Sequence, residues 1–269
     1  MRMSRLGVGL AIVIAVTNNP TVFGLSSSTA PARTPDVEFP RPPLPGSIVA
    51  IGQLNGDNAC EFGETDPQTV GSGTWTVLRV GGDCAVSVLA TWTGGLTDGP
   101  EGVTANLPAT LEDASPSSPP DALAAATVCK TAKQHYFTFG FGGAIFDKLT
   151  HVYSSLSYCY NDTYVWGSST TGSSCNGASE LGWAWVVDSC VYVSQSLSQS
   201  TNQVWSTVRG NFHCNPPANA PCSLSNPDGY FHRLFAKVTA FQSGHSSCTN
   251  WWDGQIVLGP EMEIISGCT

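Results

Sequence analysis

Hydrophobic and polar residues alternate along much of the C-terminal half of the chain, with the period of two that is typical of β-strands. Leu156, Tyr158 and Tyr160 fall on one face of such a segment, and Cys159 falls on the other. The segment 231–241 places its small apolar residues on one face and its charged residues on the other. Since strands with one apolar face bury that face, we expect both tyrosines to pack against an opposing sheet.

The segment 181–193 is predicted to be a strand that carries several aromatic residues. One face holds Trp183, Trp185, Val187 and Val191. The other face holds Asp188, Cys190 and Tyr192. Further short strands are expected over 47–54, 74–80, 85–92, 202–212, 254–258 and 261–265. Many strands separated by Gly- and Ser-rich loops predict a mainly β fold, an antiparallel sandwich stapled by disulfides, with a small N-terminal β-unit.

Changes in composition divide the chain into five parts. They are a signal peptide over 1–32, a Pro-rich linker over 33–45, a small β-unit over 46–96, a linker over 97–120 and the β-sandwich domain over 121–269. One helix is expected at the start of the last part, over 121–130, because Asp121 suits an N-cap and alanines follow it.

The first residues have the pattern of a secretory signal. Arg2 and Arg5 precede an uncharged apolar run over 6–16, which is too short to span a bilayer, and Ala30-Pro31-Ala32 fits a cleavage site. The alternative is a single membrane anchor. We expect a secreted, extracellular protein that is not anchored after the signal is removed.

Ten cysteines follow the signal, and an even number in an exported chain predicts a disulfide framework. They are Cys60, Cys84, Cys129, Cys159, Cys175, Cys190, Cys214, Cys222, Cys248 and Cys268. Short closures suggest three pairs: Cys60 with Cys84, Cys214 with Cys222, and Cys248 with Cys268. For Cys159 the expected partner is Cys175 or Cys190. Without a Cys-x-x-Cys or a His pair at ligand spacing, we expect no metal site and no cofactor.

The charge of the chain is sparse and acidic. Lys and Arg number 11 and Asp and Glu 20, a formal net charge of −9. Removing Arg2 and Arg5 leaves 9 against 20, or −11 for the mature form. Because such a surface repels phosphate backbones, nucleic-acid binding is not expected.

The best candidate for ligand binding is the segment 249–255, with Asn250, Trp251, Trp252 and Asp253. Adjacent tryptophans in an extended segment cannot both enter one core. An exposed indole can stack on the apolar face of a sugar or on a protein partner, and the two polar neighbours could add hydrogen bonds. The alternative is that one tryptophan only plugs the end of the sandwich.

Motifs for catalysis are weak. The sequence has no G-x-S-x-G motif, and its nearest string is GHSSC at 244–248. Glu261 and Glu263 resemble part of the acidic strand of some cellulase-type sandwiches, but the third acidic position falls on Ser266. Asn161 begins an N-glycosylation sequon, Asn-Asp-Thr, which matters only if the source glycosylates exported proteins.

The spacing F-x-x-L-x-x-x-Y-x-x-x-x-Y-C-Y-N, from Phe146 to Asn161, resembles a motif in a loose group of uncharacterised exported bacterial proteins of actinobacterial type. The resemblance covers residues 140–245. This chain has Asp162 where glycine is common in the group and Tyr158 where tryptophan is common. The resemblance implies export and a β-rich fold, and no activity.

Taken together, these features predict a secreted, disulfide-stabilised protein that is not an enzyme and that binds a cell-surface glycan or protein. The alternatives are a secreted hydrolase, with a site assembled from scattered His and acidic residues, and a purely structural envelope component. A cleft with an acid beside a histidine would favour the hydrolase, and a flat patch with Trp251 or Trp252 would favour binding.

Overall fold

The computed structural model describes residues 41–55, 59–100, 127–139, 148–161, 163–168, 172–177, 179–180, 183–214, 231–257 and 262–269. All of them belong to one compact unit, Glu38–Thr269. The predicted signal peptide, residues 1–32, lies outside the described residues.

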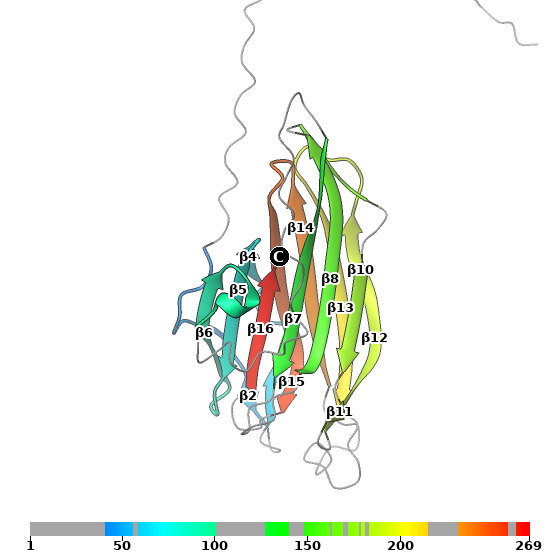
Figure 1. Ribbon diagram of the computed structural model, residues 1–269. Coiled ribbons are helices and arrows are strands. Elements are labelled where there is room, and N and C mark those ends of the chain that lie inside the picture. Colours follow the sequence, from blue (N-terminus) through cyan, green and yellow to red (C-terminus); the bar gives the residue numbers. More distant parts are fainter. Residues whose placement is uncertain are drawn as a thin grey trace, which may run out of the picture. The chain divides into compact units, whose positions relative to one another are not determined.

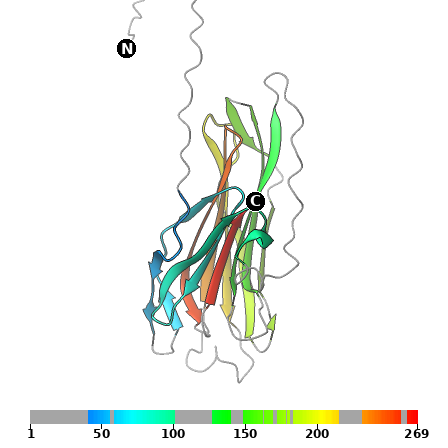
Figure 2. The same cartoon turned by 60° about the vertical axis from the view of Figure 1, so that its left-hand side comes forward.

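Two antiparallel sheets build this unit, and the predicted disulfide-stapled sandwich is confirmed (Figure 1; Figure 2 shows it turned by 60°). Sheet A contains, in spatial order, β1 (Ile48–Ile51), β6 (Ala85–Thr93), β5 (Thr74–Val80), β16 (Met262–Cys268), β7 (Val128–Phe139), β8 (Lys148–Asn161) and β10 (Gly172–Gly177), and β9 (Tyr164–Gly167) also pairs with β8. Sheet B contains β11 (Ser179–Glu180), β12 (Trp183–Ser196), β13 (Gln203–Cys214), β14 (Phe231–Phe241), β15 (Ser246–Val257), β3 (Ala59–Phe62) and β2 (Gln53–Leu54), and β4 (Gln68–Gly71) also pairs with β15.

The segment 46–96 contributes strands to both sheets. In sheet A, β5 pairs with the C-terminal strand β16. In sheet B, β3 and β4 both pair with β15. Strands β3, β4 and β5 are therefore joined by backbone hydrogen bonds to β15 and β16, near the C-terminus. A short 3₁₀ turn, η1 (Leu96–Asp98), follows β6.

The predicted helix over 121–130 is wrong for its last three residues. Val128–Lys130 open β7, where Val128 faces Tyr160 and Cys129 faces Cys159 on β8. Ladder hydrogen bonds with a long neighbouring strand outweigh a weak local helix propensity. Residues 121–126 lie outside the described part of the chain.

The predicted faces of β12 are correct only up to Val187. Trp185 and Val187 pack in the core, as predicted, but Cys190 packs there too, and Val191 is exposed. The register with β13 shifts between Val187 and Ser189. An extra residue at such a bulge turns the following side chains to the opposite face, up to the second register shift between Tyr192 and Ser194, and a strict alternation of two does not anticipate this.

The interior of the sandwich has two apolar clusters separated by a polar layer. One cluster contains Leu78, Tyr136, Val152, Phe212, Leu234, Trp252 and Ile264, and the other contains Ala132, Leu156, Tyr158, Val204, Val238 and Cys248. On five strands the inward residue between the clusters is polar: Gln134, Ser154, Ser206, Asn250 and Ser266, each at most 4% exposed. The prediction that Tyr158 packs in the core is confirmed, and Tyr160 packs against the same cluster while partly exposed.

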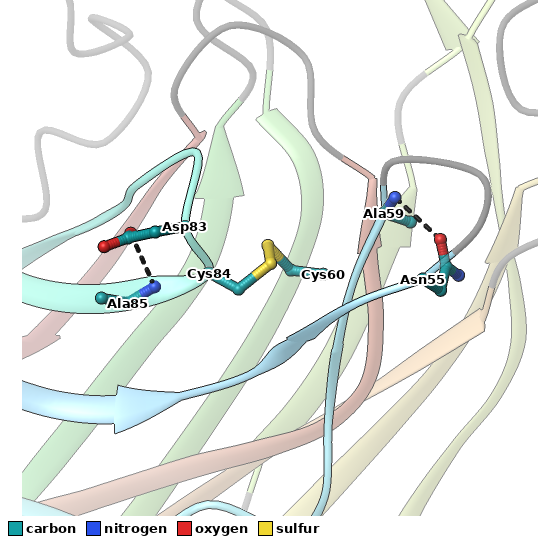
Figure 3. Close-up of a disulfide and its surroundings, with 6 residues drawn as sticks. All are labelled: Asn55, Ala59, Cys60, Asp83, Cys84 and Ala85. Carbon is teal, nitrogen blue, oxygen red and sulfur yellow. Dashed lines mark hydrogen bonds between the residues drawn. A yellow bond between two sulfur atoms is a disulfide. The ribbon is translucent and has the colours of Figure 1, made fainter.

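Three of the four described disulfides join sheet A to sheet B. They are Cys60–Cys84, Cys175–Cys190 and Cys248–Cys268. The first links β3 to the turn before β6, where Asp83 accepts a hydrogen bond from the Ala85 amide (Figure 3). Closing a loop of 15 to 24 residues lowers the entropy of the unfolded chain, by an amount worth about 3 kcal/mol for each bond.

The predicted pairs Cys60–Cys84 and Cys248–Cys268 are confirmed, whereas the partners expected for Cys159 are wrong. Cys159 bonds to Cys129, its direct neighbour across β7 and β8, with Cα atoms 4.0 Å apart. The two alternatives, Cys175 and Cys190, bond to each other. The predicted pair of Cys214 with Cys222 lies partly outside the described residues. The four disulfides indicate an oxidising compartment.

Candidate functional site

The two adjacent tryptophans of β15 face opposite sides of sheet B. Trp252 is 1% exposed and makes an edge contact with Phe62, with ring centroids 6.0 Å apart. Trp251 points to the outer face and is half-buried. The prediction that they cannot share one core is confirmed, because side chains alternate along an extended strand.

The polar neighbours of this pair are divided in the same way. Asn250 is 1% exposed and belongs to the interior polar layer. Asp253 lies on the outer face, where the Arg233 Nε donates to its Oδ1 at 2.6 Å. Of the four residues predicted from the sequence, the structure therefore brings only Trp251 and Asp253 to the outer face.

On that face Trp251 stacks on Phe235 of β14. The ring centroids are 4.9 Å apart and the planes differ by 6°. The two residues are direct cross-strand partners, and Arg209 of β13 is the partner of Phe235 on its other side. One row of the sheet thus presents a guanidinium beside two parallel aromatic rings.

A second contact between a cation and an aromatic ring lies close to this row. Lys237 follows Phe235 by two residues on the same face, and its Nζ lies 5.4 Å from the centre of the Trp205 ring. We use the name outer patch for five half-buried residues of β13, β14 and β15. They are Trp205, Arg209, Phe235, Lys237 and Trp251.

Of the five residues of the outer patch, the sequence pattern predicts only Trp251 as a binding residue. The alternation in β14 already placed Lys237 outward, and the same rule could have placed Phe235 beside it. What the sequence did not contain was the register that sets Phe235 opposite both Trp251 and Arg209. Without the register, the aromatic residues of three separate strands have no reason to be grouped.

The outer patch leaves some polar atoms without a partner. The indole Nε1 of Trp251 and the Nε of Arg209 are buried atoms and make no hydrogen bond with the described residues. Hydroxyl groups lie in the row of Lys237, between Trp205 and the stacked pair: Thr69 and Thr249 are 2.8 Å apart, and Ser194 donates to Thr207 at 3.1 Å. Aromatic rings and hydroxyl groups on neighbouring rows suit binding by stacking and hydrogen bonding.

The groups with shifted pKa values lie in the interior or at the end of the sandwich, away from the outer patch. Burial lowers the pKa of His232 to about 3. The neutral ring shares a hydrogen bond of 2.9 Å with Thr150, which in turn lies 2.8 Å from Thr138. Burial also raises the pKa of Tyr158 to about 12, and its hydroxyl donates to the carbonyl of Gly244 at 2.9 Å.

An acid does lie beside a histidine on the outer face of sheet B, as the hydrolase alternative would require. The Nδ1 of His213 is 2.5 Å from the Oδ1 of Asp188, and both side chains are partly exposed. Within the part of the chain that the structure describes, no hydroxyl or thiol is hydrogen-bonded to the other ring nitrogen of His213. The pair therefore lacks the nucleophile of a serine-type site there.

The other catalytic candidates from the sequence lie in a hairpin turn and on a central strand. The string GHSSC at 244–248 covers the end of the hairpin turn after β14 and the start of β15, not a strand-to-helix turn. Glu263 is 9% exposed on the central strand β16 of sheet A and pairs with Arg79 at 3.0 Å. Glu261 lies outside the described residues.

Within the described ranges, no group of three or more His, Cys, Asp or Glu residues could hold a metal ion. The same ranges contain no helix long and apolar enough to cross a membrane. No protein-family model matches the sequence, and no curated protein or solved structure matches it. The geometry of the outer patch is therefore the basis for a functional proposal.

Proposed function

We propose that this protein is exported and that its outer patch binds a glycan outside the cell. The observation that carries this proposal is the stacked pair of Trp251 and Phe235 on the outer face of sheet B, with Arg209 beside it. Because the rings belong to paired strands, they are held rigidly before any ligand arrives, and binding costs little side-chain entropy.

A glycan fits these residues better than a protein partner does. A stable protein interface buries about 800 Å² on each side and has an apolar centre. The outer patch instead combines a few aromatic rings with a row of serine and threonine hydroxyls. Sugar rings offer both partners at once, because their C–H faces cover aromatic rings and their hydroxyls form hydrogen bonds with polar groups.

Export is supported by the N-terminal pattern over 1–32 and by the disulfides. Three of these bonds connect the two sheets, so the fold depends on oxidation. Passage through an oxidising compartment during export would allow these disulfides to form before the protein is released. N-terminal sequencing of the protein from culture supernatant would test export, and recovery of the uncleaved chain only from cells would contradict it.

The binding proposal is tested with a panel of neutral and acidic oligosaccharides, by calorimetry or affinity electrophoresis. We expect Trp251→Ala to weaken binding at least about tenfold, because it removes one ring of the stacked pair. Trp166→Ala is the matched control, since Trp166 is a half-buried tryptophan on β9 of sheet A. Equal loss in both variants, or binding only to a protein partner, would contradict the proposal.

A further inference from the structure

The charges on the three strands of the outer patch and on the neighbouring strand β12 are unbalanced. Strands β12 to β15 contain three Lys or Arg residues and two acidic residues. Both acidic residues are engaged: Asp253 with Arg233 and Asp188 with His213. The next acidic side chain, Glu61 of β3, faces Gln255, outside the outer patch. Arg209 and Lys237 therefore have no carboxylate partner among the described residues.

This local positive charge stands out against the rest of the chain, whose formal net charge is −9. Arg209 lies directly across from Phe235, and Lys237 follows Phe235 on the same face of the strand. Arg209 is thus the direct strand neighbour of the stacked pair, and the ammonium of Lys237 lies nearby, over the Trp205 ring. A cation at such a site attracts an anionic group, and the planar fork of arginine matches a carboxylate.

We propose that the outer patch binds a glycan whose sugar rings carry carboxylate groups, of the uronic-acid class. This inference rests on the glycan-binding function proposed above. One uronic-acid ring presents a C–H face, which Trp251 or Phe235 covers, and a carboxylate, which Arg209 pairs with. Lys237 serves as a second cation for the next acidic ring along the chain.

The number of cations favours a short acidic stretch of sugar over a densely charged polymer. Double-stranded DNA carries one charge per about 1.7 Å, and proteins that bind it commonly neutralise several phosphates. The outer patch offers two unpaired cations on a protein that is acidic as a whole. Two carboxylates on neighbouring sugar rings would be enough to pair with these two cations.

The test compares short oligomers of galacturonic acid with the same oligomers after chemical reduction of their carboxyl groups to alcohols. Calorimetry on the full mature protein measures both affinities. We expect the acidic oligomer to bind at least about tenfold more tightly than the reduced one, and Arg209→Gln to remove most of this difference. Binding of the acidic oligomer is also expected to weaken as sodium chloride rises from about 0.05 to about 0.5 M.

Lys130→Gln is the matched control for charge. Lys130 also lies over an aromatic ring, 5.3 Å from the centre of Tyr160, but it is near the start of β7 in sheet A. It should leave the affinity within about twofold. If Arg209→Gln does not fold, Arg209→Lys takes its place, because it keeps the charge without the planar fork. Its affinity for the acidic oligomer should then lie between the affinities of the wild-type protein for the acidic and for the reduced oligomer.

The outcomes separate this inference from the proposed function. Equal binding of the acidic and reduced oligomers, abolished by Trp251→Ala, would overturn the acidic ligand and leave glycan binding in place. An acidic preference that Lys130→Gln removes as strongly as Arg209→Gln would also overturn it, since the charge would act without a specific site. No binding of any acidic or neutral oligosaccharide would overturn both proposals.

Discussion

The indole of Trp75 lies against Gly267 so closely that a Cβ atom at residue 267 would come within 2.1 Å of the ring. Gly267 is on β16, between Trp75 of β5 and His135 of β7. The Trp75 and His135 rings stack with centroids 6.1 Å apart. The absence of a side chain on the middle strand allows aromatic residues of the two outer strands to meet.

Gly267→Ala is therefore expected to destabilise the protein. The new methyl group would displace the buried Trp75 ring, and overpacking of this kind costs roughly 1 to 3 kcal/mol. Gly71→Ala is the control, because a Cβ at this strand position has no neighbour within 4 Å. Urea unfolding of both variants measures the difference. A stability of Gly267→Ala within error of Gly71→Ala would mean that Trp75 moves without cost.

Partial reduction should break the disulfides in the order of their exposure. Cys129 is exposed and Cys159 half-buried, whereas Cys60, Cys84, Cys248 and Cys268 are at most 1% exposed. Since a thiolate must reach a sulfur atom to attack it, Cys129–Cys159 should open first in the folded protein. Brief treatment with dithiothreitol, alkylation and peptide mass spectrometry identify the labelled cysteines. Early labelling of Cys60 or Cys248 would show that the sandwich opens before it is reduced.

Acid should weaken the fold through His232. Its pKa is 6.5 in an unperturbed chain and about 3 in the fold, because burial disfavours the imidazolium. As the pH falls below 6.5, the unfolded chain takes up the proton and the folded chain does not, so stability falls by about 1.4 kcal/mol per pH unit until the pH nears 3. Above pH 6.5 the His232 ring is neutral in both the folded and the unfolded chain, so its protonation no longer lowers the free energy of unfolding.

His232→Gln should have a smaller loss of stability between pH 6 and pH 4 than the wild type, as measured by urea unfolding across that range. Leu234→Ala is a suitable control. It removes a buried side chain from the same strand without changing a titratable group, so it should lower stability equally at both ends of the range. If the stability of the wild type and of His232→Gln fell in parallel as the pH was lowered, His232 would not be the cause of the loss in acid.

The interior polar layer yields a prediction about Gln134. The residue is 0% exposed, and neither its amide oxygen nor its amide nitrogen bonds to a described residue. A buried unpaired polar group costs roughly 1 to 3 kcal/mol, so Gln134→Met, of similar volume, should leave stability unchanged or raise it. Unfolding in urea measures the change. A loss above about 1 kcal/mol would show that the amide is hydrogen-bonded in solution.

Alternation predicted the individual strands well and their partners poorly. The strand 74–80 and the core face of β14 follow directly from residue type, because alternation is a local property of the extended chain, although β5 proves to be buried on both faces. The pairing of β5 with β16 joins residues nearly 190 positions apart. The sequence around β5 does not identify such a distant neighbour, because many strands share the same alternating pattern.

The disulfides show the same division. Counting cysteines was enough to predict a disulfide framework, and short spacing found Cys60–Cys84 and Cys248–Cys268. Spacing failed for Cys159, because Cys129 reaches it through the register of two long strands and not through a short loop. Bonding depends on the distance between Cα atoms, and that distance is set by strand pairing.

For the candidate site, the chain's amino-acid order alone established that one of two neighbouring tryptophans must leave the core, because extended backbone alternates its side chains. The identity of the exposed one, its stacking on Phe235 and the neighbouring charge of Arg209 followed from folding. These residues come from three strands, and only the cross-strand hydrogen bonds bring them into one row. A binding surface on a sheet is thus a property of register, which depends on the whole assembled sandwich and not on any one segment.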